Sequence, residues 1–176
     1  MLANFITDPG FVLTLRWLLA SVFLIALVHK LKEPAEFRVT LEDYQLLPVI
    51  FLRPAFFALV ATELVVVCAL LANTIFGGIA AVALLSVYTL AIGINLIRGR
   101  TEIDCGCSGP AVRQTLSIWL VVRNIGLITL ALITFFGAAD RVLGILDWFT
   151  SLAAASVFAL IYSTAAQLST FNRAQI

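Results

Sequence analysis

The chain has 176 residues, of which 62% are hydrophobic and 12% charged, and its mean hydropathy is +1.08. Soluble domains carry roughly 45–50% apolar and about 25% charged residues, so this composition excludes a soluble globular domain and predicts a protein surrounded by membrane lipid. The net charge of +1 does not support binding to nucleic acid, and three cysteines are too few for a secreted disulfide scaffold.

Five runs of the chain are apolar enough and long enough to cross a bilayer as helices, which takes about 20 residues each. They cover residues 10–29, 54–73, 74–97, 113–137 and 142–168. Helices are expected because backbone amides cannot stay unpaired in hydrocarbon. The first run is expected to be retained, since the opening residues hold no Lys or Arg and lack the basic region of a signal peptide. The predicted fold class is all-α, a polytopic membrane helical bundle in which residues 1–176 form a single domain.

The first two connections between these runs differ in character. Residues 30–53 are polar, and their apolar side chains recur at helical spacings, at Phe37, Leu41, Tyr44 and Leu47. This pattern predicts a short amphipathic helix on the membrane surface, with a polar loop of accidental periodicity as the alternative. The next connection is so short that Asn73 and the Gly77–Gly78 pair are predicted to form a tight hairpin.

Several polar side chains lie well inside the apolar runs, namely Arg16, Glu63, Asn95 and Arg123. An unpaired charge in hydrocarbon is costly, so these residues are predicted to face the bundle interior. The simplest pairing joins Glu63 to Arg123 or to Arg16. Such a pair could fix helix packing or line a functional polar pocket, and both interpretations stay open. His29, the single histidine, is more typical of a helix end at the membrane interface than of a catalytic base.

The connection after the third run contains Cys105-Gly106-Cys107. Two cysteines one residue apart can close a disulfide, and the intervening glycine accepts the unusual dihedral angles of so small a ring. A strained, exposed disulfide exchanges readily, so Cys105 and Cys107 are candidate catalytic residues for thiol–disulfide exchange. Two reduced cysteines in a tight turn are the alternative.

Charged neighbours of the cysteine pair would act on its reactivity in opposite directions. Arg98, Arg100 and Arg113 would favour the thiolate, as would the amides at the start of the following helix. Glu102 and Asp104 oppose this effect, and the balance stays open. No metal site is predicted, because two thiolates supply only half of a tetrahedral zinc site and the sequence holds no second such pair.

Lys and Arg in short loops indicate the orientation of a membrane protein. With five spans and the N-terminus outside, eight of the nine Lys and Arg in the connections and the tail would lie inside. This count favours an external N-terminus and a cytoplasmic Cys105-Gly106-Cys107 loop.

Two patches of sequence carry a family resemblance. The first consists of HKL at 29–31, EPAEF at 33–37 and YQLLP at 44–48; the second consists of INLIRGR at 94–100 and IDCGC at 103–107. In these patches, and in its helix arrangement along nearly the full length, the chain resembles the MauE family of membrane accessory proteins of methylamine utilisation. That family is in turn similar to DoxX-like membrane proteins, and the second patch is the more specific of the two.

The resemblance implies a bundle with a four-helix DoxX-like core in the bacterial inner membrane. It also implies a role in maturing the small, disulfide-rich subunit of methylamine dehydrogenase, or of a related amine dehydrogenase, alongside a thioredoxin-like partner. This client lies in the periplasm, whereas the charge count favours a cytoplasmic loop. Either electrons cross the bilayer or the charge count misleads.

The leading hypothesis is a membrane thiol–disulfide oxidoreductase in which Cys105 and Cys107 cycle between dithiol and disulfide through exchange with a partner's cysteines. A quinone is the one cofactor considered, held by the charged interior. The alternative is a non-catalytic scaffold or transport helper for a secreted client, with incidental or structural cysteines. A small-molecule transporter is not favoured, because the sequence shows no inverted repeat or paired broken helices.

Overall fold

The structure, a computed structural model, describes residues 8–105, 115–135 and 142–171. Within these ranges the regular elements are all helical, which confirms the predicted fold class. They are α2 (Pro9–Lys32), α3 (Pro34–Asp43), the short 3-10 helix η1 (Val49–Phe51), α4 (Leu52–Leu71), α5 (Ile75–Ile97), α6 (Ile118–Phe135) and α7 (Ile145–Phe171). Five helices, α2 and α4 to α7, are long and apolar enough to cross a membrane, as predicted.

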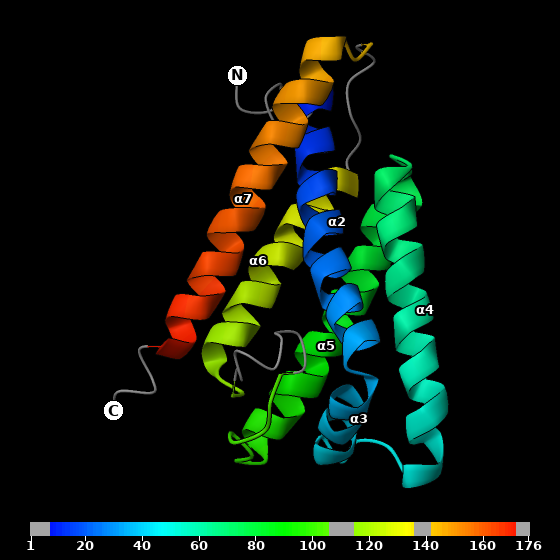
Figure 1. The fold of residues 1–176 in the computed structure, drawn as a ribbon, viewed down its shortest axis with the longest axis vertical. Coiled ribbons are helices and arrows are strands. Elements are labelled where there is room, and N and C mark those ends of the chain that lie inside the picture. Colours follow the sequence, from blue (N-terminus) through cyan, green and yellow to red (C-terminus); the bar gives the residue numbers. More distant parts are fainter. Residues whose placement is uncertain (1–7, 106–114, 136–141, 172–176) are drawn as a thin grey trace.

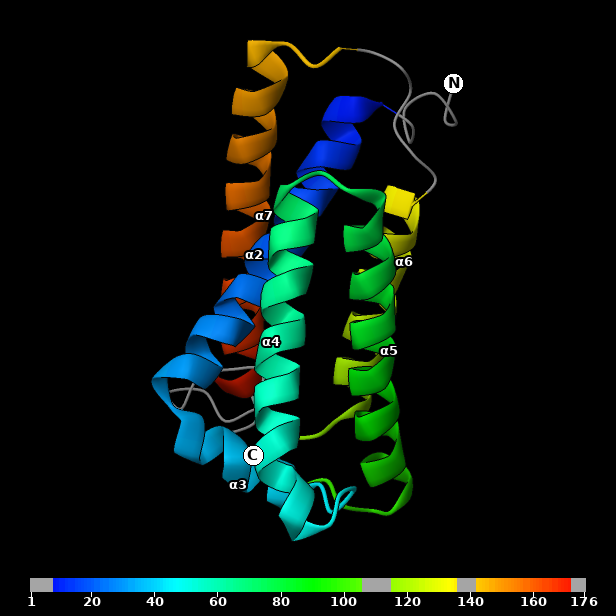
Figure 2. The same ribbon diagram turned by 90° about the vertical axis from the view of Figure 1, so that its right-hand side faces the viewer.

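The five long helices run in alternating directions along one axis (Figure 1). Helix α2 packs against α4, α6 and α7, and α5 packs between α4 and α6. Figure 2 shows α4 and α5 side by side, with α3 lying across one end of the bundle. The four-helix unit of α2, α4, α5 and α6 therefore encloses the core, and α7 covers an outer face of α2.

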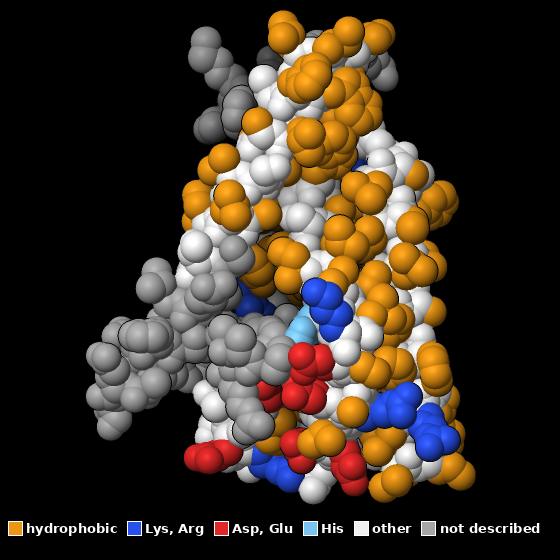
Figure 3. Space-filling model, in the orientation of Figure 1, with side chains coloured by type: hydrophobic (Ala, Val, Ile, Leu, Met, Phe, Trp, Pro, Cys, Tyr) orange, Lys and Arg blue, Asp and Glu red, His pale blue; other side chains and the backbone are white. Residues whose placement is uncertain are grey.

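The core of the bundle is made of aliphatic side chains with one phenylalanine, Phe23, from α2. Large apolar side chains nevertheless stay exposed along the helices, including Phe57 at 62%, Leu90 at 65% and Ile161 at 57%. Figure 3 shows hydrophobic side chains over much of one face of the molecule. A soluble protein rarely exposes so continuous an apolar surface, so hydrocarbon is the surrounding that fits these helices.

Helix α2 has a defined start and a defined end. The Asp8 side chain caps its first turn by accepting hydrogen bonds from the backbone N–H groups of Gly10, at 2.9 Å, and Phe11, at 3.3 Å. At the other end α2 continues to Lys32, and Pro34 then begins α3. The predicted boundary at residue 29 is therefore wrong by almost a turn, because the charged end of α2 stays helical until a proline intervenes.

The amphipathic helix predicted between the first two spans is confirmed as α3. Phe37 and Tyr44 are buried, and the Phe37 ring packs against Phe56 of α4 with centroids 6.0 Å apart. Leu47 lies beyond the helix and is exposed. The alternative of a polar loop with accidental periodicity is thus wrong.

The turn between α4 and α5 is tight, but the nearby glycines, Gly77 and Gly78, do not form it. Asn73 lies in this turn with φ at +57°, which confirms the predicted tight hairpin, but Gly77 and Gly78 lie inside α5 and not in the turn as predicted. A Cβ atom on Gly77 would lie 2.7 Å from Leu70 N and 2.8 Å from Ala69 C. Glycine is required because the backbones of α4 and α5 approach closely at this point, a packing mode common between membrane helices.

Gly77→Ala is expected to lower the free energy of unfolding by about 1–3 kcal/mol, because the added methyl group overlaps backbone atoms that cannot rotate away. Gly93→Ala, on the same helix with no atom within 4 Å of the added Cβ, is the matched control. It should be neutral or stabilising by up to about 1 kcal/mol through helix propensity. Denaturant unfolding in detergent measures both, and equal losses would contradict the close approach at Gly77.

Candidate functional site

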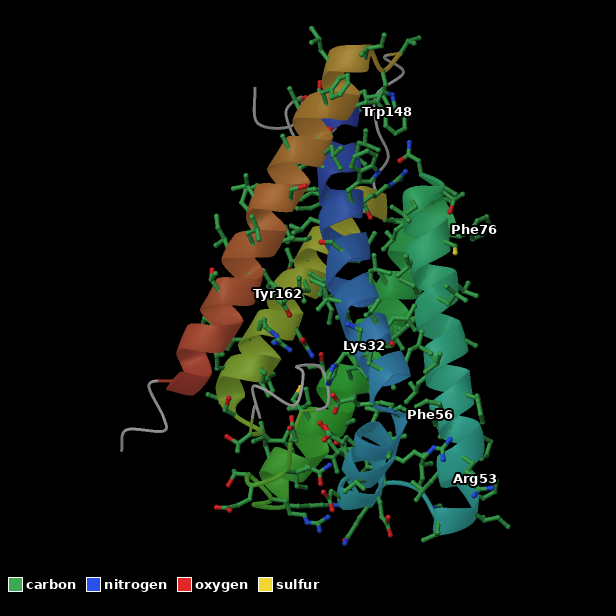
Figure 4. The ribbon with its side chains drawn as sticks, viewed as in Figure 1. Lys32, Arg53, Phe56, Phe76, Trp148 and Tyr162 are labelled. Atoms are coloured by element: carbon green, nitrogen blue, oxygen red, sulfur yellow. The ribbon has the colours of Figure 1, made fainter. Side chains whose placement is uncertain are left out.

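Charged side chains gather at one end of the bundle. In Figure 3 the Lys, Arg, Asp and Glu side chains lie mostly toward the end that carries α3, and hydrophobic side chains cover much of the remaining surface. Figure 4 places Lys32 and Arg53 toward this end and Phe76 and Trp148 toward the opposite one. The connection between α5 and α6, which contains Cys105, begins at this charged end.

Cys105 is held in a small apolar cluster. Its side chain is 6% exposed and belongs to a group with Tyr44, Ile92, Leu116 and Leu120. The Tyr44 hydroxyl donates to the Cys105 carbonyl oxygen at 3.5 Å. The cysteine was expected in an exposed turn, yet the structure buries it between the end of α3 and helices α5 and α6.

The connection is closed at its base. The Leu116 N–H donates to the Ile103 carbonyl oxygen at 3.0 Å, and an isolated antiparallel bridge joins Asp104 to Thr115. Asp104, predicted to influence the thiols, therefore takes part in this closure through its backbone. Gly106, Cys107 and Arg113 lie outside the described residues, so a Cys105–Cys107 pair remains a prediction.

Arg98 and Arg100 link this connection to the end of α3. The guanidinium of Arg100 donates to the Asp43 carbonyl oxygen at 3.1 Å, and that of Arg98 donates to the Gln45 carbonyl oxygen at 3.5 Å. Their proposed support of a thiolate remains a prediction. The contacts do show that the two patches behind the family resemblance meet in space around Cys105.

The intramembrane carboxylate of Glu63 has a different partner from the one predicted. Glu63 and Lys30 are 0% and 1% exposed and form an ion pair through Glu63 Oε1. The Tyr88 hydroxyl donates to the same oxygen at 2.7 Å. The pairing of Glu63 with Arg123 or Arg16 is therefore wrong. Because α2 extends to Lys32, Lys30 lies on the buried face of α2, one turn beyond Leu27.

The two intramembrane arginines, Arg16 and Arg123, contact different residues. Arg16, 6% exposed, donates to the carbonyl oxygen of Asn73 at 2.6 Å, to the side-chain oxygen of Asn73, and to the carbonyl oxygen of Thr134 at 3.1 Å. It faces the bundle, as predicted, and joins α2 to the turn after α4 and to α6. The Arg123 guanidinium lies 5.7 Å from the ring centroid of Tyr162 on α7.

Asn95 is fully buried, in agreement with its predicted interior position. Its side-chain nitrogen donates to the Ala91 carbonyl oxygen at 3.1 Å. Its side-chain oxygen is buried without a hydrogen-bond partner in the part of the chain that the structure describes. Asn124 is also buried, at 3% exposed, so both asparagines lie in the interior.

A cavity of about 380 Å³ lies between α3, α4 and α5 and reaches Cys105. Its lining is almost entirely apolar and includes Lys30, Tyr44, Ala58, Tyr88, Ala91 and Cys105. Lys30 and Tyr88 were not predicted as site residues. For Lys30 a signal was available, since it continues the helical spacing of Phe23 and Leu27; for Tyr88 we find no such signal.

Comparison with known proteins gives one consistent family. Residues 9–137 match the family model described as methylamine utilisation protein MauE. The chain is 34% identical over 177 residues to methylamine utilization protein MauE of Paracoccus denitrificans, covering 99% of this chain and 95% of that protein. It is 36% identical over 161 residues to the protein of the same name from Paracoccus versutus (88% and 84% covered). For the Methylophilus methylotrophus protein the identity is 30% over 166 residues (92% and 87%). No solved structure matches the chain.

Proposed function

Because this multi-pass membrane protein belongs to the MauE family, we propose that it takes part in methylamine utilisation as a membrane accessory protein. Its client would be the disulfide-rich small subunit of a periplasmic amine dehydrogenase, reached together with a thioredoxin-like partner. The bundle would reside in the bacterial inner membrane. The observation that carries the proposal is the position of Cys105, held where the two patches typical of the family meet.

The proposed chemistry is thiol–disulfide exchange at Cys105 and Cys107. A thiolate of the partner attacks one sulfur of the Cys105–Cys107 disulfide and forms a mixed disulfide. The partner's second thiolate then displaces the protein, which leaves a disulfide in the partner and a dithiol in this chain. Two electrons and two protons pass from the partner to Cys105 and Cys107, so the partner is oxidised and this chain is reduced.

The burial of Cys105 suggests an order for the two sulfurs. At 6% exposed, Cys105 is poorly placed for attack by an incoming thiolate. We therefore propose that the partner attacks Cys107 and that Cys105 leaves as a thiolate, after which the partner's second thiolate attacks the mixed disulfide and releases Cys107.

This order predicts different results for the two single variants. In Cys105→Ser, Cys107 is the one thiol of the pair, and its thiolate attacks the disulfide of an oxidised thioredoxin-like partner. Because Cys105 is absent and cannot expel that partner again, the mixed disulfide should accumulate. Cys107→Ser should accumulate much less, because Cys105, the cysteine of the pair that it retains, is buried; both variants are made in a Cys68→Ser background. Non-reducing gel electrophoresis after acid quenching measures both species. Equal accumulation in the two variants would refute the order, and none in either would count against exchange.

The route of the electrons depends on the side of the membrane on which the Cys105–Cys107 pair lies. Direct exchange with a periplasmic partner requires the Cys105 end to face the periplasm, whereas the count of Lys and Arg favours the cytoplasm. Cys107 can be labelled with an impermeant maleimide in a Cys68→Ser, Cys105→Ser background. Labelling in cells with a permeabilised outer membrane supports direct exchange. Labelling only after the inner membrane is opened would require electrons to cross the bundle.

A further inference from the structure

We propose that the cavity beside Cys105 binds a membrane quinone, which reoxidises the Cys105–Cys107 dithiol. The inference rests on the proposed function, since exchange leaves a dithiol that needs an electron acceptor before the next cycle. Three features of the structure support it: the size and lining of the cavity, the polar groups at its wall, and the presence of Cys105 in the lining.

The cavity suits an apolar ring that arrives from lipid. Its volume of about 380 Å³ falls within the range of roughly 300–1,000 Å³ typical of small-molecule sites. Side chains from α3, α4 and α5 line it, and Ala58 in the lining is itself exposed on α4. The cavity therefore borders the surface that faces hydrocarbon, and an isoprenoid quinone, which partitions into the bilayer, can enter without crossing water.

The wall of the cavity also carries hydrogen-bond donors. They favour a quinone as the occupant over a saturated lipid chain, which has no hydrogen-bond acceptor. Lys30 is 1% exposed, and its ammonium group has three N–H donors. Among the described residues it has two acceptors, Glu63 Oε1 and the Tyr88 hydroxyl at 3.4 Å. One donor is thus left for a quinone carbonyl oxygen, an acceptor with no donor of its own.

The carboxylate of Glu63 belongs to the same polar cluster. Its Oε2 atom is buried and has no hydrogen-bond partner within the described ranges of the chain. Leaving a buried charged oxygen unpaired is costly, so an ionisable cluster of this kind inside a membrane is a candidate functional site. Glu63 itself does not line the cavity; its carboxylate holds Lys30 and Tyr88, two polar residues that do.

The reaction balances with the quinone as the oxidant. The sulfurs of Cys105 and Cys107 form an S–S bond and give up two electrons and their two thiol protons. The quinone takes up two electrons and two protons at its two carbonyl oxygens and becomes a quinol. Because Cys105 contributes to the cavity lining, one of the two reacting cysteines borders the space where the ring would lie.

The test uses the full chain, reduced and placed in lipid nanodiscs without oxygen. A short-tailed benzoquinone is added, quinol formation is followed by absorbance, and thiol loss is followed by maleimide gel shift. We expect one quinol for each dithiol lost. Ala91→Phe fills the cavity and should slow the reaction by about tenfold, equivalent to about 1.4 kcal/mol of lost binding. Ala61→Phe, exposed on α4 outside the lining, should leave the rate unchanged.

A second variant and a second oxidant separate this inference from the proposed function. Tyr88→Phe keeps the ring, removes a hydroxyl from the cavity wall, and should raise the KM for quinone. Wild type and all variants should react equally with oxidised glutathione, a water-soluble disulfide. If wild type reacts with glutathione and not with quinone, or if Ala91→Phe has no effect, the quinone inference is overturned and the proposed function stands. If wild type reacts with neither, thiol–disulfide exchange itself is wrong.

Discussion

The double variant Cys105→Ser, Cys107→Ser is expected to abolish maturation of the dehydrogenase small subunit while leaving the membrane bundle folded. Serine replaces each thiol with a group of similar size that cannot form a disulfide, so the exchange reaction stops and packing changes little. Maturation is measured as active dehydrogenase and as disulfides formed in the client. The free energy of unfolding in detergent should fall by no more than about 1–3 kcal/mol, the cost of burying a serine hydroxyl in the apolar cluster around position 105.

Cys68→Ser is the matched control for this experiment. Cys68 is exposed on α4 and does not line the cavity beside Cys105, so its replacement should leave maturation unchanged. Wild-type levels of mature client in the double variant would exclude thiol exchange. The scaffold or transport-helper alternative would then be favoured.

The second large effect is the loss of stability expected when the ion pair between Lys30 and Glu63 is broken. Glu63→Leu should lower the free energy of unfolding by about 3–5 kcal/mol, because it leaves the buried Lys30 ammonium without its carboxylate. Lys30→Met should be similarly harmful, since it leaves the carboxylate unpaired. The combined Lys30→Met, Glu63→Leu variant should recover most of the loss, because neither charge then remains in the interior. Denaturant unfolding in detergent provides all four values.

Glu36, whose carboxylate is exposed, provides the control for this double-mutant cycle. Glu36→Ala on α3 should change stability by less than about 0.5 kcal/mol, because its side chain is exposed at the charged end of the bundle. If the two single losses at Lys30 and Glu63 simply add in the double variant, the pair is not coupled. That outcome would contradict the ion pair.

The helices of the fold were predictable because the length and hydropathy of each run determine whether it can cross a bilayer. The end of α2 was predicted three residues too early, and this small error hid Lys30 as the partner of Glu63. Hydropathy falls at Lys30, so that residue was counted in a loop, although the helix continues until Pro34 interrupts it. A helix breaker marks a helix end better than a drop in hydropathy does, because a membrane helix can extend past the hydrocarbon.

The candidate site was only partly predictable. The pattern of Cys105-Gly106-Cys107 identified a chemistry, and the interior positions of Glu63 and Asn95 followed from the cost of exposing polar groups to lipid. The partner of Glu63 depends on which helices are neighbours and on their rotation. The cavity depends on how α3 folds back against α4 and α5. These are tertiary relations that the periodicity of a single run does not contain.

The bridge between Asp104 and Thr115, together with the hydrogen bond from Leu116 to Ile103, holds together the two ends of the connection between α5 and α6. A segment anchored in this way can change length at little thermodynamic cost, since doubling a flexible loop adds only about 0.6 kcal/mol of closure entropy. Insertions between Asp104 and Thr115 are therefore expected to leave the packing of the bundle and the burial of Cys105 unchanged.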